Sequence, residues 1–365
     1  MSLKPIVGRM ALLAVAALIV TACGPTSPAP VGPSAAAPPP ATAAPASAAT
    51  SPNVLRVGEV RGTAGHALFV AKGRGYFEKQ GLDVQLVEVS SGAELLPLLA
   101  SGQLDAGVSS AGAALFNAIA NNVPLKAVVD LARNQPGAWW GGLVVRPDLL
   151  DGGAIKTPAD LRGKTIAVTG PGTSTYMNTI RLLEANGLTE KDVNIVSMPF
   201  PEMITALASR NIDVAAVSEP TLTVGQDQGV LRRWVSNAEI NPGEQEVVMT
   251  ITPGLAGNRE VADRFVLALV QAIHDYRAAF GPEKRDQEAV VGAMLPWLGT
   301  NYTAETLRRM APVGMDPDGL VNRDSIKDQQ DWYVAHGLVK KPVDVDAVVD
   351  NSFAERAGAT LATQR

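Results

Sequence analysis

Residues 54–87, VLRVGEVRGTAGHALFVAKGRGYFEKQGLDVQLV, decide the fold class of this chain. The stretch opens with Val54–Gly58, whose alternating side chains predict a strand, and Leu82–Val87 alternates at period two in the same way. Between these two segments, His66–Arg74 has the pattern of a short helix that ends at Gly75. A strand, a helix and a strand in this order predict a βα unit in a largely parallel sheet.

The same alternation of strands and helices continues along the chain, which predicts an α/β fold. Further strands are expected at residues 106–108, 125–129, 165–168, 193–197, 214–217 and 247–251, and further helices at 93–101, 111–120, 175–186, 201–209 and 259–280.

One pattern occurs twice in this series. Leu99-Ala100-Ser101, Asp105 and Ser109 have nearly the same spacing as Leu207-Ala208-Ser209, Asp213 and Ser218, which lie about 108 residues later (207 against 99). In open α/β sheets, ligands bind beyond the carboxyl ends of the strands. Two such lobes facing each other would form a cleft, and chance similarity between two βα units is the alternative.

The beginning of the chain has the pattern of an export signal. Lys4 and Arg9 precede a charge-free run, Met10–Ala22, which at 13 residues is too short to span a bilayer. The only cysteine, Cys23, follows directly. This pattern resembles the lipobox of bacterial lipoproteins, which implies that residues 1–22 are removed and that Cys23 carries fatty acyl chains such as palmitate. The alternative is an ordinary signal peptide with a chance cysteine.

After Cys23 comes a stretch without charge. Residues 24–53 contain nine prolines and no charged side chain, so we expect 23–53 to be an acylated, disordered linker that tethers the exported protein to the outer face of the cell membrane. The remaining chain is long enough for two domains. We expect residues 54–145 plus 250–365 to form one lobe and 146–249 the other, joined by two hinge strands.

Composition excludes several classes of function. The formal net charge is −5 and no basic run occurs, which argues against nucleic acid as a partner. His66, His274 and His336 are far apart and show no metal-ligand spacing. Because phosphate-loop and nucleophile-elbow motifs are missing as well, we expect no metal, no cofactor and no catalytic residue.

Five ordered motifs carry a resemblance to a known family. Residues 66–84, 101–107, 158–165, 170–174 and 217–220 are similar to the periplasmic solute-binding proteins of nitrate, taurine and thiamine-precursor ABC transporters, over residues 54 to about 280. This resemblance implies a two-lobed periplasmic-binding-protein fold of type II with two hinge strands. It also implies a monomer that closes on a small molecule and delivers it to an ABC permease, whose ATPase subunit hydrolyses ATP.

Within this family, the segment around His66 looks most like the branch that handles thiamine pyrimidine precursors and riboflavin. His66 could donate a hydrogen bond to a ring nitrogen or carbonyl of such a ligand, or it could be an ordinary histidine at a helix start. Ser109 and Ser110 end a strand at the expected cleft. They are candidate ligand contacts for that reason.

Trp139 and Trp140 form an aromatic pair before two glycines. Adjacent residues of a strand point to opposite sides, so at most one of them would face the cleft and stack on a flat ring. Alternatively, both pack between lobe and hinge.

The segment Gly170–Thr175 leaves a strand and enters a helix. The amides and hydroxyls of Gly172, Thr173, Ser174 and Thr175 could hold an anion or a carbonyl oxygen, or serve only as a helix cap. In the sulfonate and nitrate branch this position is an anion cradle.

Glu219 follows a strand of the second lobe. A carboxylate there would favour amino or ring N–H donors and repel sulfonate or nitrate, unless it is a hinge or surface residue. His66, a tryptophan and Glu219 together favour a nitrogen heterocycle, riboflavin before a thiamine pyrimidine precursor. A sulfonate, taurine or nitrate is the alternative. An enzyme similar to thiamine pyrimidine synthase is a distant one, because those enzymes resemble this chain but use a cysteine-rich iron motif.

Overall fold

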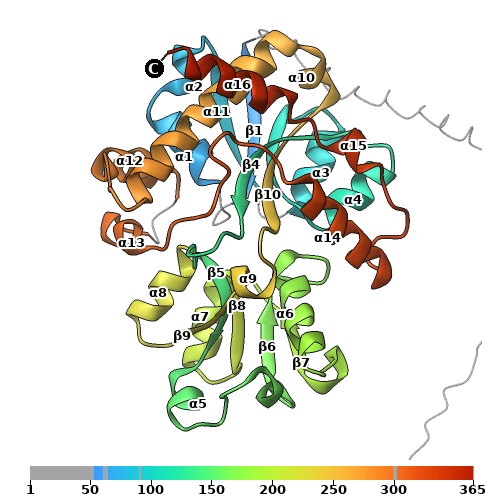
Figure 1. Ribbon diagram of the computed structural model, residues 1–365, viewed down its shortest axis with the longest axis vertical. Coiled ribbons are helices and arrows are strands. Elements are labelled where there is room, and N and C mark those ends of the chain that lie inside the picture. Colours follow the sequence, from blue (N-terminus) through green and yellow to red (C-terminus); the bar gives the residue numbers. More distant parts are fainter. Residues whose placement is uncertain (1–52, 61–64, 90–91, 299–301, 365) are drawn as a thin grey trace, which may run out of the picture. The chain divides into compact units, whose positions relative to one another are not determined.

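The computed structural model describes residues 53–60, 65–89, 92–298 and 302–364 (Figure 1). All of them belong to one compact unit, Ser47–Arg365. The predictions made for Cys23, for residues 1–22 and for the linker 23–53 fall outside the described residues, except for Asn53 at the linker's end. No helix within the described ranges is long and apolar enough to cross a membrane.

Two five-stranded sheets form the framework. The first has the order β2 (Asp83–Val89), β1 (Val54–Val60), β3 (Ala106–Ser110), β10 (Gln245–Ile251), β4 (Lys126–Arg133). The second has the order β7 (Asn194–Ser197), β6 (Thr165–Val168), β8 (Val214–Ser218), β5 (Gly141–Val145), β9 (Arg232–Ser236). The α/β prediction is confirmed, with each predicted strand present.

Both sheets are mixed rather than largely parallel. In the first, β1 is parallel to β2 and β3, whereas β10 is antiparallel to β3 and β4. In the second, β6 is parallel to β7 and β8, whereas β5 is antiparallel to β8 and β9. The sequence analysis missed β5 and β9. β5 is buried at every position, so its sequence does not alternate between apolar and polar residues. Position 142 requires glycine, because a Cβ there would lie 2.3 Å from the Val235 carbonyl oxygen of β9.

Helices flank each sheet (Figure 1). Their bounds are α1 His66–Gly73, α2 Tyr76–Lys79, α3 Gly92–Ala100, α4 Ala113–Ala120, α5 Pro147–Asp151, α6 Ser174–Ala185, α7 Phe200–Ala208, α8 Thr221–Asp227, α9 Asn237–Ile240, α10 Pro253–Gly257, α11 Arg259–Phe280, α12 Gln287–Met294, α13 Ala304–Arg309, α14 Arg323–Ala335, α15 Val345–Val348 and α16 Ser352–Ala362.

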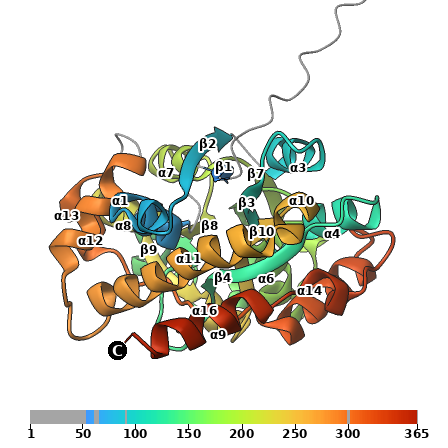
Figure 2. The same cartoon turned by 90° about the horizontal axis from the view of Figure 1, so that it is seen from above.

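The long helix α11 organises the core of the first sheet. Its apolar face is buried along the whole length, from Val261 to Tyr276. Phe265 on this face stacks on Phe77 of α2 with ring centroids 5.4 Å apart. α16 lies along α11, as Figure 2 shows from above. Burial of such a face, rather than intrinsic propensity, supplies most of a helix's stability.

The pattern that occurs twice in the sequence has the same structural role in both sheets. Asp105 precedes β3 and accepts a hydrogen bond from the backbone N–H of Arg56 in β1, at 2.8 Å. Asp213 precedes β8 and accepts one from the backbone N–H of Thr165 in β6, at 3.0 Å. Each aspartate thus fixes the register of a parallel pair at its start, which confirms the two copies as equivalent βα units.

The chain passes between the sheets twice, at residues 134–140 and 241–244, and we call these segments the crossovers. They are hydrogen-bonded to each other. The Asn134 amide donates to the Glu244 carbonyl oxygen at 2.8 Å, and the Gly243 amide donates to the Asn134 carbonyl oxygen at 2.9 Å. β5 therefore belongs to the second sheet and β10 to the first. The division into lobes at residues 145 and 250 stays a prediction.

Candidate functional site

The turns that follow β3 and β6 meet. The backbone N–H of Ala113 donates to the Gly172 carbonyl oxygen at 2.9 Å. Gly112 makes this approach possible, because a Cβ there would lie 2.7 Å from the same oxygen. The carboxyl ends of strands from both sheets are thereby brought to one place, which is where the sequence analysis expected a ligand.

His66 begins α1 and is completely buried. Its ring stacks on that of Tyr276 in α11, with centroids 5.5 Å apart and planes 19° apart. Neither ring nitrogen has a hydrogen-bond partner among the described residues. Burial lowers the pKa of His66 to about 4, so at neutral pH the imidazole is uncharged and offers one N–H donor and one acceptor.

Glu219 lies at the end of β8 and is 1% exposed. Its carboxylate accepts hydrogen bonds from the backbone N–H and the hydroxyl of Thr223, at 3.0 and 2.9 Å. It also accepts one from the Arg233 guanidinium at 2.8 Å and one from the backbone N–H of Ala311 at 2.9 Å. Burial raises the pKa of Glu219, although each of these hydrogen bonds lowers it.

The segment after α13 connects Glu219 with the His66 stack. While Ala311 binds Glu219, the backbone N–H of Val313 donates to the Tyr276 hydroxyl at 3.1 Å. On the other side of Glu219, the Arg233 guanidinium lies 5.1 Å from the centre of the Trp139 ring. The structure thus brings His66, Glu219 and Trp139 into one chain of contacts. Tyr276 and Arg233 complete this chain, and the sequence analysis missed both.

The two adjacent tryptophans pack in different places, as expected for neighbours in an extended chain. Trp139 is half-buried against the apolar cluster of the second sheet, and its backbone carbonyl accepts a hydrogen bond from Arg233 at 2.9 Å. Trp140 is 2% exposed within the cluster of the first sheet, and its indole N–H donates to the Arg133 carbonyl oxygen at 3.3 Å. Trp139 is therefore the member of the pair with exposed surface.

The two serines at the end of β3 also differ. Ser109 is buried, and its hydroxyl lies 2.8 Å from that of Thr250 in β10, which donates to the Gly107 carbonyl oxygen. Ser110, one residue further, is exposed.

Most polar groups at the start of α6 are used within the loop itself. Thr173 caps the helix by accepting from the Tyr176 amide at 3.3 Å and donates to the Gly170 carbonyl oxygen at 2.7 Å. The Thr175 hydroxyl accepts from the backbone N–H of Thr169 at 3.0 Å. Ser174 is the exception, because its hydroxyl reaches out of the loop and donates to the Glu246 carboxylate of β10 at 3.0 Å.

Glu246 belongs to a buried polar group that the sequence analysis missed. We call it the crossover cluster, and its members are Asn134, Asn178, Ser174, Asn237, Glu244 and Glu246. Asn237 donates to Glu246 at 2.8 Å, and Asn134 and Asn178 donate to Glu244 at 2.9 and 2.7 Å. The sequence Glu244-Gln245-Glu246, two acids entering an apolar strand, was the available signal.

Both acids of the crossover cluster have raised pKa values. Burial raises the pKa of Glu246 to about 7, against the hydrogen bonds from Ser174 and Asn237. Burial and the neighbouring Glu246 hold the pKa of Glu244 well above its usual range. A carboxyl group that is partly protonated at neutral pH can both donate and accept a hydrogen bond.

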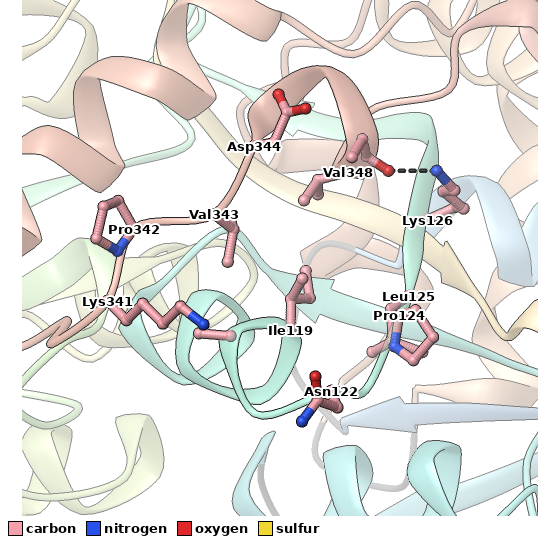
Figure 3. Close-up of a pocket in the computed structure, with 12 residues that line it drawn as sticks. Ile119, Asn122, Pro124, Leu125, Lys126, Lys341, Pro342, Val343, Asp344 and Val348 are labelled. Atoms are coloured by element: carbon pink, nitrogen blue, oxygen red, sulfur yellow. Dashed lines mark hydrogen bonds between the residues drawn. The ribbon is translucent and has the colours of Figure 1, made fainter.

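A cavity of about 370 Å³ lies elsewhere on the first sheet (Figure 3). It is lined by the end of α4, the start of β4 and residues 341–348, and it contains none of the predicted site residues. Within the ranges that the structure describes, no group of three or more histidine, cysteine or acidic side chains could hold a metal ion.

Comparison with known proteins places this geometry in context. The family model described as NMT1/THI5 like matches residues 64–279. A putative ABC transporter periplasmic binding protein of Brachyspira hyodysenteriae is 26% identical over 300 residues, which cover 77% of this chain and 82% of the relative. The riboflavin-binding protein RibY of Chloroflexus aurantiacus is 24% identical over 305 residues, covering 78% and 81%.

A solved structure shares the architecture. The alkanesulfonate-binding protein SsuA of Xanthomonas axonopodis pv. citri, bound to MOPS, matches with a TM-score of 0.65 at 21% identity, over 83% of this chain and 99% of that one. The likeness confirms the predicted fold class.

Proposed function

The chain belongs to the NMT1/THI5-like family, and from this premise we propose that it is the solute-binding component of an ABC importer. It captures a small molecule outside the cytoplasm and delivers it to a membrane permease, whose ATPase subunit supplies the energy. The names of its relatives support this role, since they are periplasmic or solute-binding proteins.

The solute is a nitrogen heterocycle, riboflavin or a thiamine pyrimidine precursor, rather than a sulfonate, taurine or nitrate. One observation carries this choice, namely the hydrogen bond from Ser174 to the buried Glu246. A helix N-terminus attracts anions through its free amides and its dipole. At the start of α6, however, the Ser174 hydroxyl is already bound to the carboxyl group of Glu246. Glu244 is a second acid close to the same place. An anionic solute there meets acidic side chains.

The other side of the site suits a flat, uncharged ring. His66 is uncharged, and its two unpartnered nitrogens can donate one hydrogen bond and accept one, which matches the alternating ring nitrogens, N–H groups and carbonyls of a heterocycle. Trp139 offers an aromatic face with exposed surface, and RibY, a relative named for riboflavin, supports the larger of the two ring systems.

Capture requires contacts with both lobes, because a solute favours closure only by interacting better with the closed state. We assign His66, Ser109 and Ser110 to one side of the solute, and Trp139, the tryptophan with exposed surface, to the side that includes Glu219. Gly172, Thr173, Ser174, Thr175 and Glu219 form the other side. The crossovers at 134–140 and 241–244 are the hinge between lobes. Acylation of Cys23 and the linker keep the protein at the outer face of the membrane as a monomer.

Tryptophan fluorescence tests the choice of solute. The purified protein without residues 1–23 is titrated separately with riboflavin, formylaminopyrimidine and taurine. We expect saturable quenching by riboflavin, with an affinity weakened at least tenfold in His66→Ala and unchanged in the control His336→Ala. His336 lies at the surface after α14 and stacks on Trp332, so this control alters the starting fluorescence but not the affinity. A response to taurine alone contradicts the heterocycle. Chemical conversion of any of the three solutes during incubation favours an enzyme instead.

A further inference from the structure

The crossover cluster links the first sheet, helices beside the second sheet and both crossovers. Glu246 lies on β10 of the first sheet and binds Ser174 of α6 and Asn237 of α9, which flank the second sheet. Glu244 lies in one crossover and binds Asn134 of the other. The two carboxyl groups are therefore built into the hinge itself.

Several buried polar atoms of this cluster and its surroundings lack a hydrogen-bond partner among the described residues, including the donor Nδ2 of Asn241 beside Glu244. Three of the cluster's buried oxygens, Glu244 Oε1, Asn134 Oδ1 and Asn178 Oδ1, have no hydrogen-bond partner among the described residues. Leaving a buried acceptor without a partner costs about 1–3 kcal/mol. One additional proton on the carboxyl pair supplies a further donor for these oxygens.

The charges around Glu244 and Glu246 also favour one bound proton on the pair. The ionisable groups that face the carboxyl pair are Arg181 of α6 and Tyr333 of α14. The Arg181 guanidinium is bound to Asp328 at 2.6 Å. Burial and the proximity of the two acids hold the pKa of Tyr333 well above its usual range, so Tyr333 stays a neutral phenol. Two buried acids that interact this closely do not both ionise at neutral pH.

We propose that Glu244 and Glu246 share one proton in this arrangement, and that this proton holds the hinge together and is taken up when solute is captured. The proposal rests on the proposed function for its second half only. When the hinge opens, water reaches the carboxyl groups, they regain ordinary acidity and the proton leaves as hydronium.

The direction of the pH effect follows from the geometry. The closed arrangement binds a proton that the open one releases, so solute affinity is highest below neutral pH and falls as the pH rises. For one proton, the fall is up to about tenfold per pH unit between the pH at which the open form loses the proton and the pH at which the closed form loses it, and it ends above the latter.

Infrared spectroscopy of the protein with saturating riboflavin, compared with the solute-free protein, tests the proton, because the closed form holds it and the open form does not. Exposed carboxyl groups are ionised by about pH 6, so a protonated-acid C=O band that persists at that pH reports a buried one. We expect this band in the wild-type protein and in Glu202→Gln, an exposed control, and its loss in the double variant Glu244→Gln plus Glu246→Gln. A wild-type spectrum with riboflavin that lacks the band overturns the proposal. If the double variant does not fold, the single variant Glu246→Gln must alter the band.

Calorimetry with riboflavin tests the coupling. Titration at about pH 6.5 in two buffers of different ionisation enthalpy measures proton uptake. We expect up to one proton taken up by the wild type and none by the double variant. Binding without proton uptake overturns the coupling. If riboflavin does not bind while the infrared band is present, the choice of solute fails and the shared proton stands.

Discussion

Replacing Glu219 by glutamine should destabilise the protein measurably. The carboxylate is 1% exposed and accepts hydrogen bonds from two backbone amides, one hydroxyl and the Arg233 guanidinium. Glutamine keeps one acceptor oxygen and turns an NH2 group toward donors. Two charge-assisted hydrogen bonds are lost, at about 1.5–3 kcal/mol each. Arg233 is about a quarter exposed and regains water, which offsets part of that loss. We expect a net loss of about 2–3 kcal/mol.

Urea unfolding at neutral pH measures this change, with Glu355→Gln on the exposed side of α16 as the control. Because burial raises the pKa of Glu219, the wild-type carboxylate protonates early as the pH falls. The folded protein then binds a proton that the unfolded chain releases, so wild-type stability rises as the pH falls toward the unfolded pKa. Glu219→Gln lacks this component, so the difference between wild type and variant should widen at mildly acidic pH. A change below about 0.5 kcal/mol at neutral pH would refute the view that Glu219 anchors the segment after α13.

Three further outcomes are expected. The pKa of His66 is lowered from 6.5 to about 4, so the unfolded chain takes up a proton that the folded protein resists. Stability should fall by up to about 3 kcal/mol as the pH drops from about 6.5 to 4, and thermal unfolding of His66→Phe should lack this component. Gly112→Ala places a Cβ 2.7 Å from the carbonyl oxygen before α6 and should cost about 1–3 kcal/mol, whereas the unobstructed Gly292→Ala in α12 should stabilise, both measured by urea unfolding. Trp139→Phe should reduce quenching by riboflavin, while Trp140→Phe, which loses a buried indole, should lower the melting temperature more.

The sequence predicted the elements whose signals are local. Period-two strands such as β2 and the apolar face of α11 were placed within a residue or two, because side-chain direction follows directly from backbone geometry. β9 begins with two arginines and pairs only with β5, which is itself buried throughout, so neither strand alternates cleanly.

The site was harder to predict because its contacts are between distant residues. His66 and Glu219 were named from their positions at strand ends, but their partners, Tyr276 and Ala311, come from much later in the chain. Glu246 was missed because an acid at the start of an apolar strand usually lies at the surface. Its partners, Ser174 of α6 and Asn237 of α9, lie in the other half of the fold and could not be read from the local sequence.

The position of β10 has a consequence for biosynthesis. Since β10 pairs with both β3 and β4, it occupies the middle of the first sheet, yet it is the last strand to leave the ribosome. Until Gln245–Ile251 is available, β3 and β4 have unpaired inner edges, which are templates for aggregation. The first sheet therefore cannot be completed during synthesis of the N-terminal half. Closing this sheet requires residues that are synthesised after the whole second sheet, whose last strand ends at Ser236.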